Sequence, residues 1–287
     1  MAAALPAHKK WSDANERSRE EVLIDLFAYF AATVPLTHVL TARGAAPFWV
    51  MAGPGALLVW ANYKPAKVKA AAPVDWFKVA KVVSALIAVG VVNCAQLGYP
   101  VSPALVGLVL SLNMAEAVLA DAMLGGNVNA LAGLGLVLLL IHSLAGSATT
   151  AWESTSEHGA GSKVGVFRFP LSTGWVAMYT SWNGAFVHGA GFAWNFRLVL
   201  LVPLVVAHVT MSDPAAWLGA RTYSLLLAQA LRGARAGRLF TPGHSFVTKA
   251  EGEGVPDPGL RVAWGTANLV GVACLAVWGA PATSSFV

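Results

Sequence analysis

Long apolar stretches separated by short polar junctions dominate this 287-residue chain. A helix needs about 20 mostly apolar residues to cross the hydrocarbon core of a bilayer. Stretches of suitable length lie at residues 22–41, 45–62, 75–97, 102–122, 127–148, 171–191, 195–212, 214–232 and 262–280. The pattern therefore predicts an all-α fold, a polytopic transmembrane helical bundle with about nine spans.

Glycine and proline mark most of the junctions, for example Gly98-Tyr99-Pro100 and Gly125-Gly126. These residues end helices, and proline is favoured in the first turn of the next helix. The stretches 45–62 and 214–232 are short or polar for a span. Eight spans are therefore the alternative, if two short stretches form a re-entrant pair.

The composition supports a membrane protein. Only 11% of the residues are charged and 56% are hydrophobic, whereas an ordinary soluble domain carries about 25% charged residues. A soluble enzyme, a disordered tail and a nucleic-acid-binding protein are therefore disfavoured, despite a net charge of +5. The partners that we expect are the lipid bilayer and a small solute or ion, and no nucleic acid.

The basic residues predict the orientation. In a nine-span topology only Arg43, Lys163 and Arg168 fall on the side opposite the N-terminus. The other loop and terminal basic residues share the N-terminal side: Lys9, Lys10, Arg17, Arg19, Lys64, Lys67, Lys69, Arg232, Arg235, Arg238, Lys249 and Arg261. By the positive-inside rule, the N-terminus is cytoplasmic and the C-terminus extracytoplasmic.

The chain divides into two parts by polarity. Residues 1–21 form a polar cytoplasmic segment without the apolar core of a signal peptide. Residues 22–287 form one transmembrane helical domain with two long loops, 149–170 outside and 233–260 inside. Cys94 and Cys274 lie in apolar stretches, where they are expected to be small core residues.

Ionisable residues inside spans are costly and therefore indicate function. Lys78 and Lys81 lie in the stretch 75–97, and Asn113 and Glu116 share one face of the stretch 102–122. A Lys81–Glu116 pair between adjacent antiparallel helices would neutralise both charges. Such a pair is either a structural contact that fixes helix register or a site that handles protons or ions. Asp121 lies near the end of the same span on another face.

An aromatic and polar stripe follows in the stretch 171–191: Tyr179, Trp182, Asn183 and Phe186, with His188 beyond it. Such a stripe either packs helices together or lines a ligand site. In the stretch 214–232, Arg221 either binds an anionic ligand or pairs with Asp213. Asn129 opens the stretch 127–148, where it caps the helix or lines a cavity.

Other chemistry has little support. The histidines within spans, His38, His142, His188 and His208, show no paired ligand pattern, so polar packing is favoured over haem or pigment binding. Motifs of nucleophilic or metal-dependent enzymes are missing from the sequence. We therefore predict no catalytic residues, no metal site and no cofactor, and a role other than that of an enzyme is favoured.

Four short motifs resemble segments of an uncharacterised family of polytopic membrane proteins of bacteria and algae, classed as a domain of unknown function. They are Trp76-Phe77-Lys78-x-x-Lys81-x-x-Ser84, Asn113-x-x-Glu116-Ala117-x-x-x-Asp121, Tyr179-x-x-Trp182-Asn183-x-Ala185-Phe186 and Arg221-Thr222-Tyr223-Ser224-Leu225. They occur in the family's order over residues 75–232. The resemblance implies the fold and a shared site, and no activity.

These observations favour a small-solute or ion transporter or channel with a buried Lys-Glu site, with proton coupling as an option. The expected substrate- or ion-binding residues are Lys81, Asn113, Glu116, Tyr179, Trp182, Asn183 and Arg221. Secondary candidates are Lys78, Asp121, Asn129 and His188. The alternatives are a membrane-embedded enzyme acting on a lipid or lipophilic substrate, and a receptor or sensor with a buried ion-pair switch.

Overall fold

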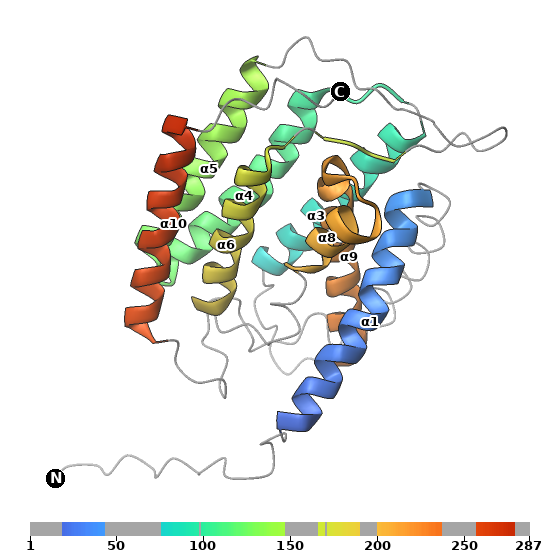
Figure 1. The fold of residues 1–287 in the computed structure, drawn as a ribbon, viewed down its shortest axis with the longest axis horizontal. Coiled ribbons are helices and arrows are strands. Elements are labelled where there is room, and N and C mark those ends of the chain that lie inside the picture. Colours follow the sequence, from blue (N-terminus) through green and yellow to red (C-terminus); the bar gives the residue numbers. More distant parts are fainter. Residues whose placement is uncertain are drawn as a thin grey trace.

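The computed structural model describes residues 19–43, 76–97, 99–146, 166–169, 171–189, 200–236 and 257–278. All regular structure in these residues is helical, as predicted (Figure 1). The α-helices are α1 (Arg19–Arg43), α3 (Trp76–Gln96), α4 (Pro103–Met123), α5 (Asn127–Gly146), α6 (Thr173–Gly189), α8 (Val202–Leu204), α9 (Trp217–Ala236) and α10 (Pro258–Trp278). A π-helix, η1 (Val205–Thr210), and a 3-10 helix, η2 (Pro214–Ala216), lie between α8 and α9.

Three helical segments are long and apolar enough to cross a membrane: Pro103–Met123, Asn127–Leu144 and Pro258–Trp278. Two shorter apolar segments are Phe30–Ala42 and Val83–Gln96. Large apolar side chains point outward from all three long helices, among them Leu112, Leu138 and Val270. An outward surface of this kind is typical of a protein that faces lipid. The predicted stretch 45–62 lies outside the described residues.

Local sequence explains where these helices begin and end. Ser102 caps α4, because its hydroxyl accepts a hydrogen bond from the Ala104 backbone amide at 3.2 Å, and Pro103 follows in the first turn. Beyond the end of α4, Gly125 has a φ of +83°, which favours glycine and turns the chain into α5. The result is a tight helical hairpin.

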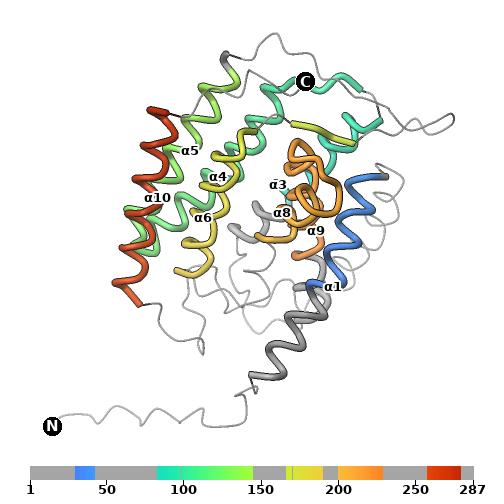
Figure 2. The backbone as a smooth tube through the Cα atoms, in the orientation of Figure 1, coloured from blue at the N-terminus to red at the C-terminus, as the bar shows by residue number. Residues whose placement is uncertain are grey.

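The helices pack in a continuous series. α10 packs against α5 and α6, and α5 packs against α4. α3 then links α4 to α9, which packs against α1 and α8 (Figures 1 and 2). The core of the bundle contains a fully buried aromatic group from α6 and α9: Tyr179, Trp182 and Trp217.

Contacts at the two ends of the bundle show that α4 and α10, and also α3 and α9, run in opposite directions. At one end, Asp121 near the end of α4 pairs with Arg261 near the start of α10. At the other end, the hydroxyl of Tyr223 in the first half of α9 donates to the side-chain carbonyl of Gln96 at the end of α3, at 2.8 Å. Alternation of this kind is what successive membrane crossings produce.

The predicted stretch 195–212 differs from one regular span where it is described. After the short helix α8 the chain widens into the π-helix η1, and Ser212 then takes a φ of +53°. The Asp213 amide donates to the Ala207 carbonyl at 2.8 Å, and the Asp213 carboxylate caps η2. The hydrophobic pattern misses this change because a π-turn keeps the same apolar residues and alters only the hydrogen-bond register.

Candidate functional site

A cavity of about 50 Å³ lies between α3, α4, α6 and α9. A buried water needs about 10–15 Å³, so this cavity has room for a ligand of a few heavy atoms. Its walls are mostly aliphatic: Ala85, Ala88, Val91, Val92, Val106, Val109, Leu110, Leu218 and Leu225. Four polar residues complete the lining: Asn113, Tyr179, Arg221 and Thr222. Three of these four are residues that the sequence singled out.

Arg221 supplies the cavity's positive charge. It lies in the second turn of α9 and is only 7% exposed. Its Nε donates to the Tyr179 hydroxyl at 3.4 Å, and its guanidinium carbon lies 5.8 Å from the centre of the Tyr179 ring. Its Nη1 is buried without a hydrogen-bond partner. In the part of the chain that the structure describes, no carboxylate forms an ion pair with Arg221.

The predicted alternative partner of Arg221, Asp213, is already used. The Asp213 Oδ2 atom accepts a hydrogen bond from Arg168 Nε at 2.6 Å, and its Oδ1 accepts from the Ala215 amide at 3.1 Å. The prediction that Arg221 pairs with Asp213 is therefore wrong. The reason is local: Asp213 caps η2, so its carboxylate is directed to the backbone of η2 and to Arg168.

Tyr179 is held in place by aromatic neighbours. Its ring stacks on Trp175 with centroids 5.3 Å apart and meets Trp217 edge-on at 5.2 Å. Its hydroxyl accepts from Arg221 Nε and from Asn183 Nδ2, the latter at 3.2 Å. Because the hydroxyl oxygen accepts in both bonds, its own hydrogen remains available to donate. Tyr179 and Arg221 therefore offer donors to a ligand from two helices.

Of the other predicted residues, some lie at the cavity and some lie elsewhere in the bundle. Asn113 lines the cavity and donates to the Ser84 hydroxyl at 3.2 Å. Asn183 reaches the site through Tyr179, whereas the fully buried Trp182 packs against Gly133 of α5 and does not line the cavity. Glu116, half-buried on α4, is also not part of the lining.

The two lysines and His188 do not join the cavity residues in the described structure. The side chains of Lys78 and Lys81 lie outside the described residues, so the Lys81–Glu116 pair stays a prediction. The His188 ring lies 6.0 Å from the Trp264 ring, at the α6–α10 contact. His188 therefore belongs to a different part of the bundle from the cavity.

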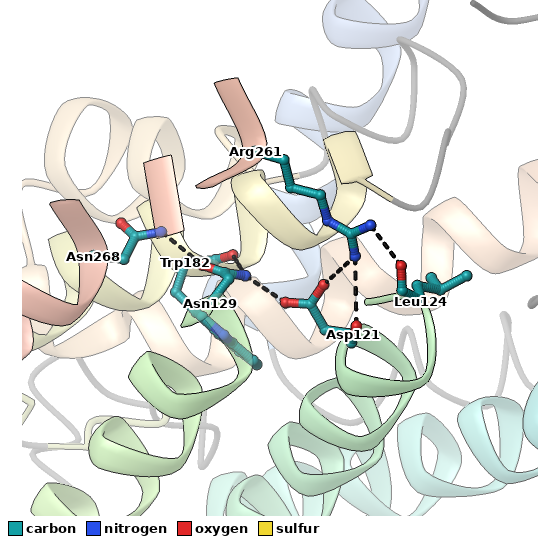
Figure 3. Close-up of polar contacts among 6 residues, drawn as sticks. All are labelled: Asp121, Leu124, Asn129, Trp182, Arg261 and Asn268. Carbon is teal, nitrogen blue, oxygen red and sulfur yellow. Dashed lines mark hydrogen bonds and ion pairs between the residues drawn. The ribbon is translucent and has the colours of Figure 1, made fainter. Parts of the chain in front are cut away.

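Asp121 and Asn129 belong to a second polar cluster, which we call the α10 network (Figure 3). Arg261 Nη2 donates to Asp121 Oδ1 at 2.8 Å, and Arg261 Nη1 donates to the Leu124 carbonyl at 2.7 Å. Asn129 Nδ2 donates to Asp121 Oδ2 at 2.7 Å and to the Trp182 carbonyl at 3.2 Å. Asp121 is 1% exposed, and both of its oxygens are engaged.

The α10 network continues into the bundle through three further side chains. Asn268 Nδ2 donates to Asn129 Oδ1 at 2.8 Å, and the Ser181 hydroxyl donates to Asn268 Oδ1 at 2.7 Å. Trp264 Nε1 then donates to the Ser181 hydroxyl at 3.0 Å. The network thus joins four helices, α4, α5, α6 and α10.

Sequence reasoning missed most of the α10 network. It named Asp121 and Asn129 separately and assigned Arg261 to a cytoplasmic loop, but Arg261 lies in the first turn of α10. Pro258 was the signal for that earlier start, because proline favours the first turn of a helix. Ser181 and Asn268 give no local signal, since their partners are 87 and 139 residues away.

The remaining expectations concern metals, histidines and cysteines. Within the described residues, no group of three or more His, Cys, Asp or Glu side chains is placed to hold a metal. His38 Nδ1 lies 2.9 Å from the Thr210 hydroxyl, while His142 and His208 are exposed. Cys94 is exposed and Cys274 is half-buried, so the prediction of a core position is wrong for Cys94. Its place on an outward apolar face explains the difference.

No family model, curated protein or solved structure matches this chain. The resemblance to the bacterial and algal membrane family therefore stays a prediction that rests on the four motifs.

Proposed function

We propose that the protein is an integral membrane transporter or channel that moves a small solute across the bilayer through a bundle of about nine spans. In this proposal the N-terminus is cytoplasmic and the C-terminus extracytoplasmic. The opposite directions of α4 and α10 and of α3 and α9 support such an arrangement, and so do the three long apolar helices. The observation that carries the proposal is the cavity beside Arg221.

A buried arginine without a counter-charge is expensive, because removing a cation from water costs several kcal/mol even after relaxation. A purely structural arginine would be paired, as Arg261 is with Asp121. Arg221 instead lines a cavity between four helices, and this cavity has room for a ligand of a few heavy atoms. Solute sites of transporters lie between helices in this way, with a few polar groups in an apolar wall.

Glu116 is the proposed coupling residue. It lies one turn beyond the cavity-lining Asn113 on α4, towards the end of the bundle that holds the α10 network. In this proposal Lys81 is its counter-ion, and protonation of Glu116 releases Lys81 and shifts the packing of α3 against α4. The packing of α3 on α4 supports this route, because a change in the pair would reach the wall of the cavity.

The test is solute flux in proteoliposomes that contain the purified protein. Osmotic swelling and pH-dye assays are run on a panel of neutral, cationic and anionic small solutes. We expect permeation of at least one class above that of empty liposomes, loss of that flux in Arg221→Gln, and an altered pH dependence in Glu116→Gln. Arg168→Gln is the matched control, because its side chain is 39% exposed and is not part of the cavity lining.

Two results would count against the proposal. Liposomes that contain folded protein and are no more permeable than empty liposomes to any solute would argue against transport. Normal flux and an unchanged pH profile in Glu116→Gln would remove Glu116 from the coupling role.

A further inference from the structure

The charge of the described cavity lining favours a monoanion as the ligand. Arg221 is the cation of the lining, and it has no carboxylate partner among the described residues. A cationic ligand would meet a like charge in a site of low dielectric. A dianion would place its second charge against aliphatic side chains, where an unpaired charge is costly. One negative charge matches one guanidinium.

The donors of the site suit a carboxylate. A guanidinium offers a planar fork of N–H groups that matches the two oxygens of a carboxylate. Arg221 Nη1 has no partner, and the Tyr179 hydroxyl, which accepts from Arg221 Nε, retains its own hydrogen. The carboxylate would thus receive hydrogen bonds from α9 and α6 together.

The rest of the lining suits a short apolar tail. The wall from α3 consists of alanine and valine, and the wall from α4 contributes Val106, Val109 and Leu110. A cavity of about 50 Å³ holds a few heavy atoms. An inorganic anion would leave these aliphatic side chains without a partner, whereas a tail of one to three carbons would cover them.

We propose that this cavity is a binding site for a short-chain monocarboxylate. Arg221 and Tyr179 bind the carboxylate, and Ala88, Val92 and Leu110 contact the tail. That this anion is also the solute carried across the membrane rests on the proposed function. Binding itself does not, so the two are tested separately.

The binding test uses the full-length protein in detergent. Thermal unfolding and isothermal titration are measured with propionate, chloride, succinate and propionamide as probes. We expect saturable stabilisation by propionate, and none by propionamide, which keeps the shape but lacks the charge. Chloride and succinate should bind at least tenfold more weakly than propionate. Equal binding of chloride and propionate, or no binding of propionate by the wild-type protein, would overturn the inference.

Three variants locate the site. Arg221→Gln should raise the propionate Kd at least tenfold, and Arg221→Lys, which keeps the charge but loses the planar fork, should have an intermediate effect. Ala88→Leu should weaken propionate binding more than acetate binding, because it fills the tail region. Arg168→Gln should bind as the wild type does. Unchanged propionate binding in both folded Arg221 variants would place the anion elsewhere and overturn the proposal.

The flux assay separates this inference from the proposed function. Propionate that binds through Arg221 but does not cross proteoliposome membranes would leave the site in place and refute transport of this anion. Transport of another solute, without binding of propionate or competition by it, would support the transporter and refute the monocarboxylate site.

Discussion

Removal of the Asp121 charge tests whether the α10 network holds the bundle together. The substitution Asp121→Asn keeps the size of the side chain but leaves Arg261 without its ion pair. It also places an amide nitrogen against the donors of either Arg261 or Asn129, because one of the two carboxylate oxygens is replaced. We expect the free energy of unfolding to fall.

The magnitude follows from burial and from the contacts that remain. Loss of one partner of a buried ion pair costs about 3–5 kcal/mol. The Asp121 side chain is 1% exposed, but that of Arg261 is 16% exposed, and Arg261 keeps its hydrogen bond to the Leu124 carbonyl. The expected loss is therefore at the lower end, about 3 kcal/mol.

The Arg168–Asp213 pair provides the matched control. Its side chains are 39% and 19% exposed, and pairs exposed to solvent contribute about 0–1 kcal/mol. Asp213→Asn removes the charge and keeps a residue that can cap η2. Unfolding in mixed micelles with increasing SDS should give a midpoint shift for Asp121→Asn several times that for Asp213→Asn. Equal shifts would refute the reasoning that burial makes the Asp121–Arg261 pair the stronger one.

Three further predictions concern packing, hydrogen bonding and topology. Gly133→Ala should destabilise the protein by about 1–3 kcal/mol in thermal unfolding, because the new Cβ would overlap the fully buried Trp182 indole. Tyr223→Phe should lower the free energy of unfolding by about 1–3 kcal/mol, because the buried Tyr223 hydroxyl lies 2.8 Å from the side-chain amide oxygens of Asn93 and Gln96 in α3, which accept its hydrogen bonds. In the proposed topology Tyr99 lies outside and Asp257 inside, at opposite ends of the bundle, and both residues are exposed. Tyr99→Cys should therefore react with an impermeant maleimide added outside intact cells, and Asp257→Cys only after permeabilisation.

Each of these predictions has its own control. Gly90→Ala should not destabilise, because nothing lies within 4 Å of the added Cβ. Tyr99→Phe should leave stability unchanged, since Tyr99 is 64% exposed. The labelling requires a background in which Cys94 and Cys274 are serine. A destabilised Gly90→Ala, a stable Tyr223→Phe or external labelling at Asp257 without permeabilisation would each contradict the corresponding reasoning.

The boundaries of α3 and α4 were predictable because they depend on neighbours in sequence. The predicted stretch 75–97 is α3, Trp76–Gln96, and the stretch 102–122 is α4, Pro103–Met123. Both boundaries follow from apolar length and from adjacent glycine or proline. The π-helix η1 was not predictable in this way, since its hydrogen-bond register is set by how residues 205–210 pack on α1 and α9.

The site was predictable as a set of residue types but not as a set of contacts. Tyr179, Asn183 and Arg221 were named together, and a hydrogen-bonded chain through the Tyr179 hydroxyl does join them. Trp182 was named with them because it shares their helix stripe, yet it packs on α5. Helical periodicity identifies the face of α6 that is buried. It does not tell which neighbouring helix each residue of that face meets.

The three arginines whose contacts are described differ in how their charges are neutralised. Arg261 pairs with the buried Asp121, and Arg168 pairs with the half-buried Asp213, so the folded chain itself supplies their counter-ions. Arg221 is only 7% exposed and has a tyrosine hydroxyl and a tyrosine ring as neighbours, which are weaker partners than a carboxylate. Since an uncompensated buried cation costs several kcal/mol, an anion that binds only the folded chain would stabilise it, and its effect should disappear in Arg221→Gln. Of these three arginines, the one without a carboxylate partner among the described residues is thus the one whose energetics depend most on a ligand.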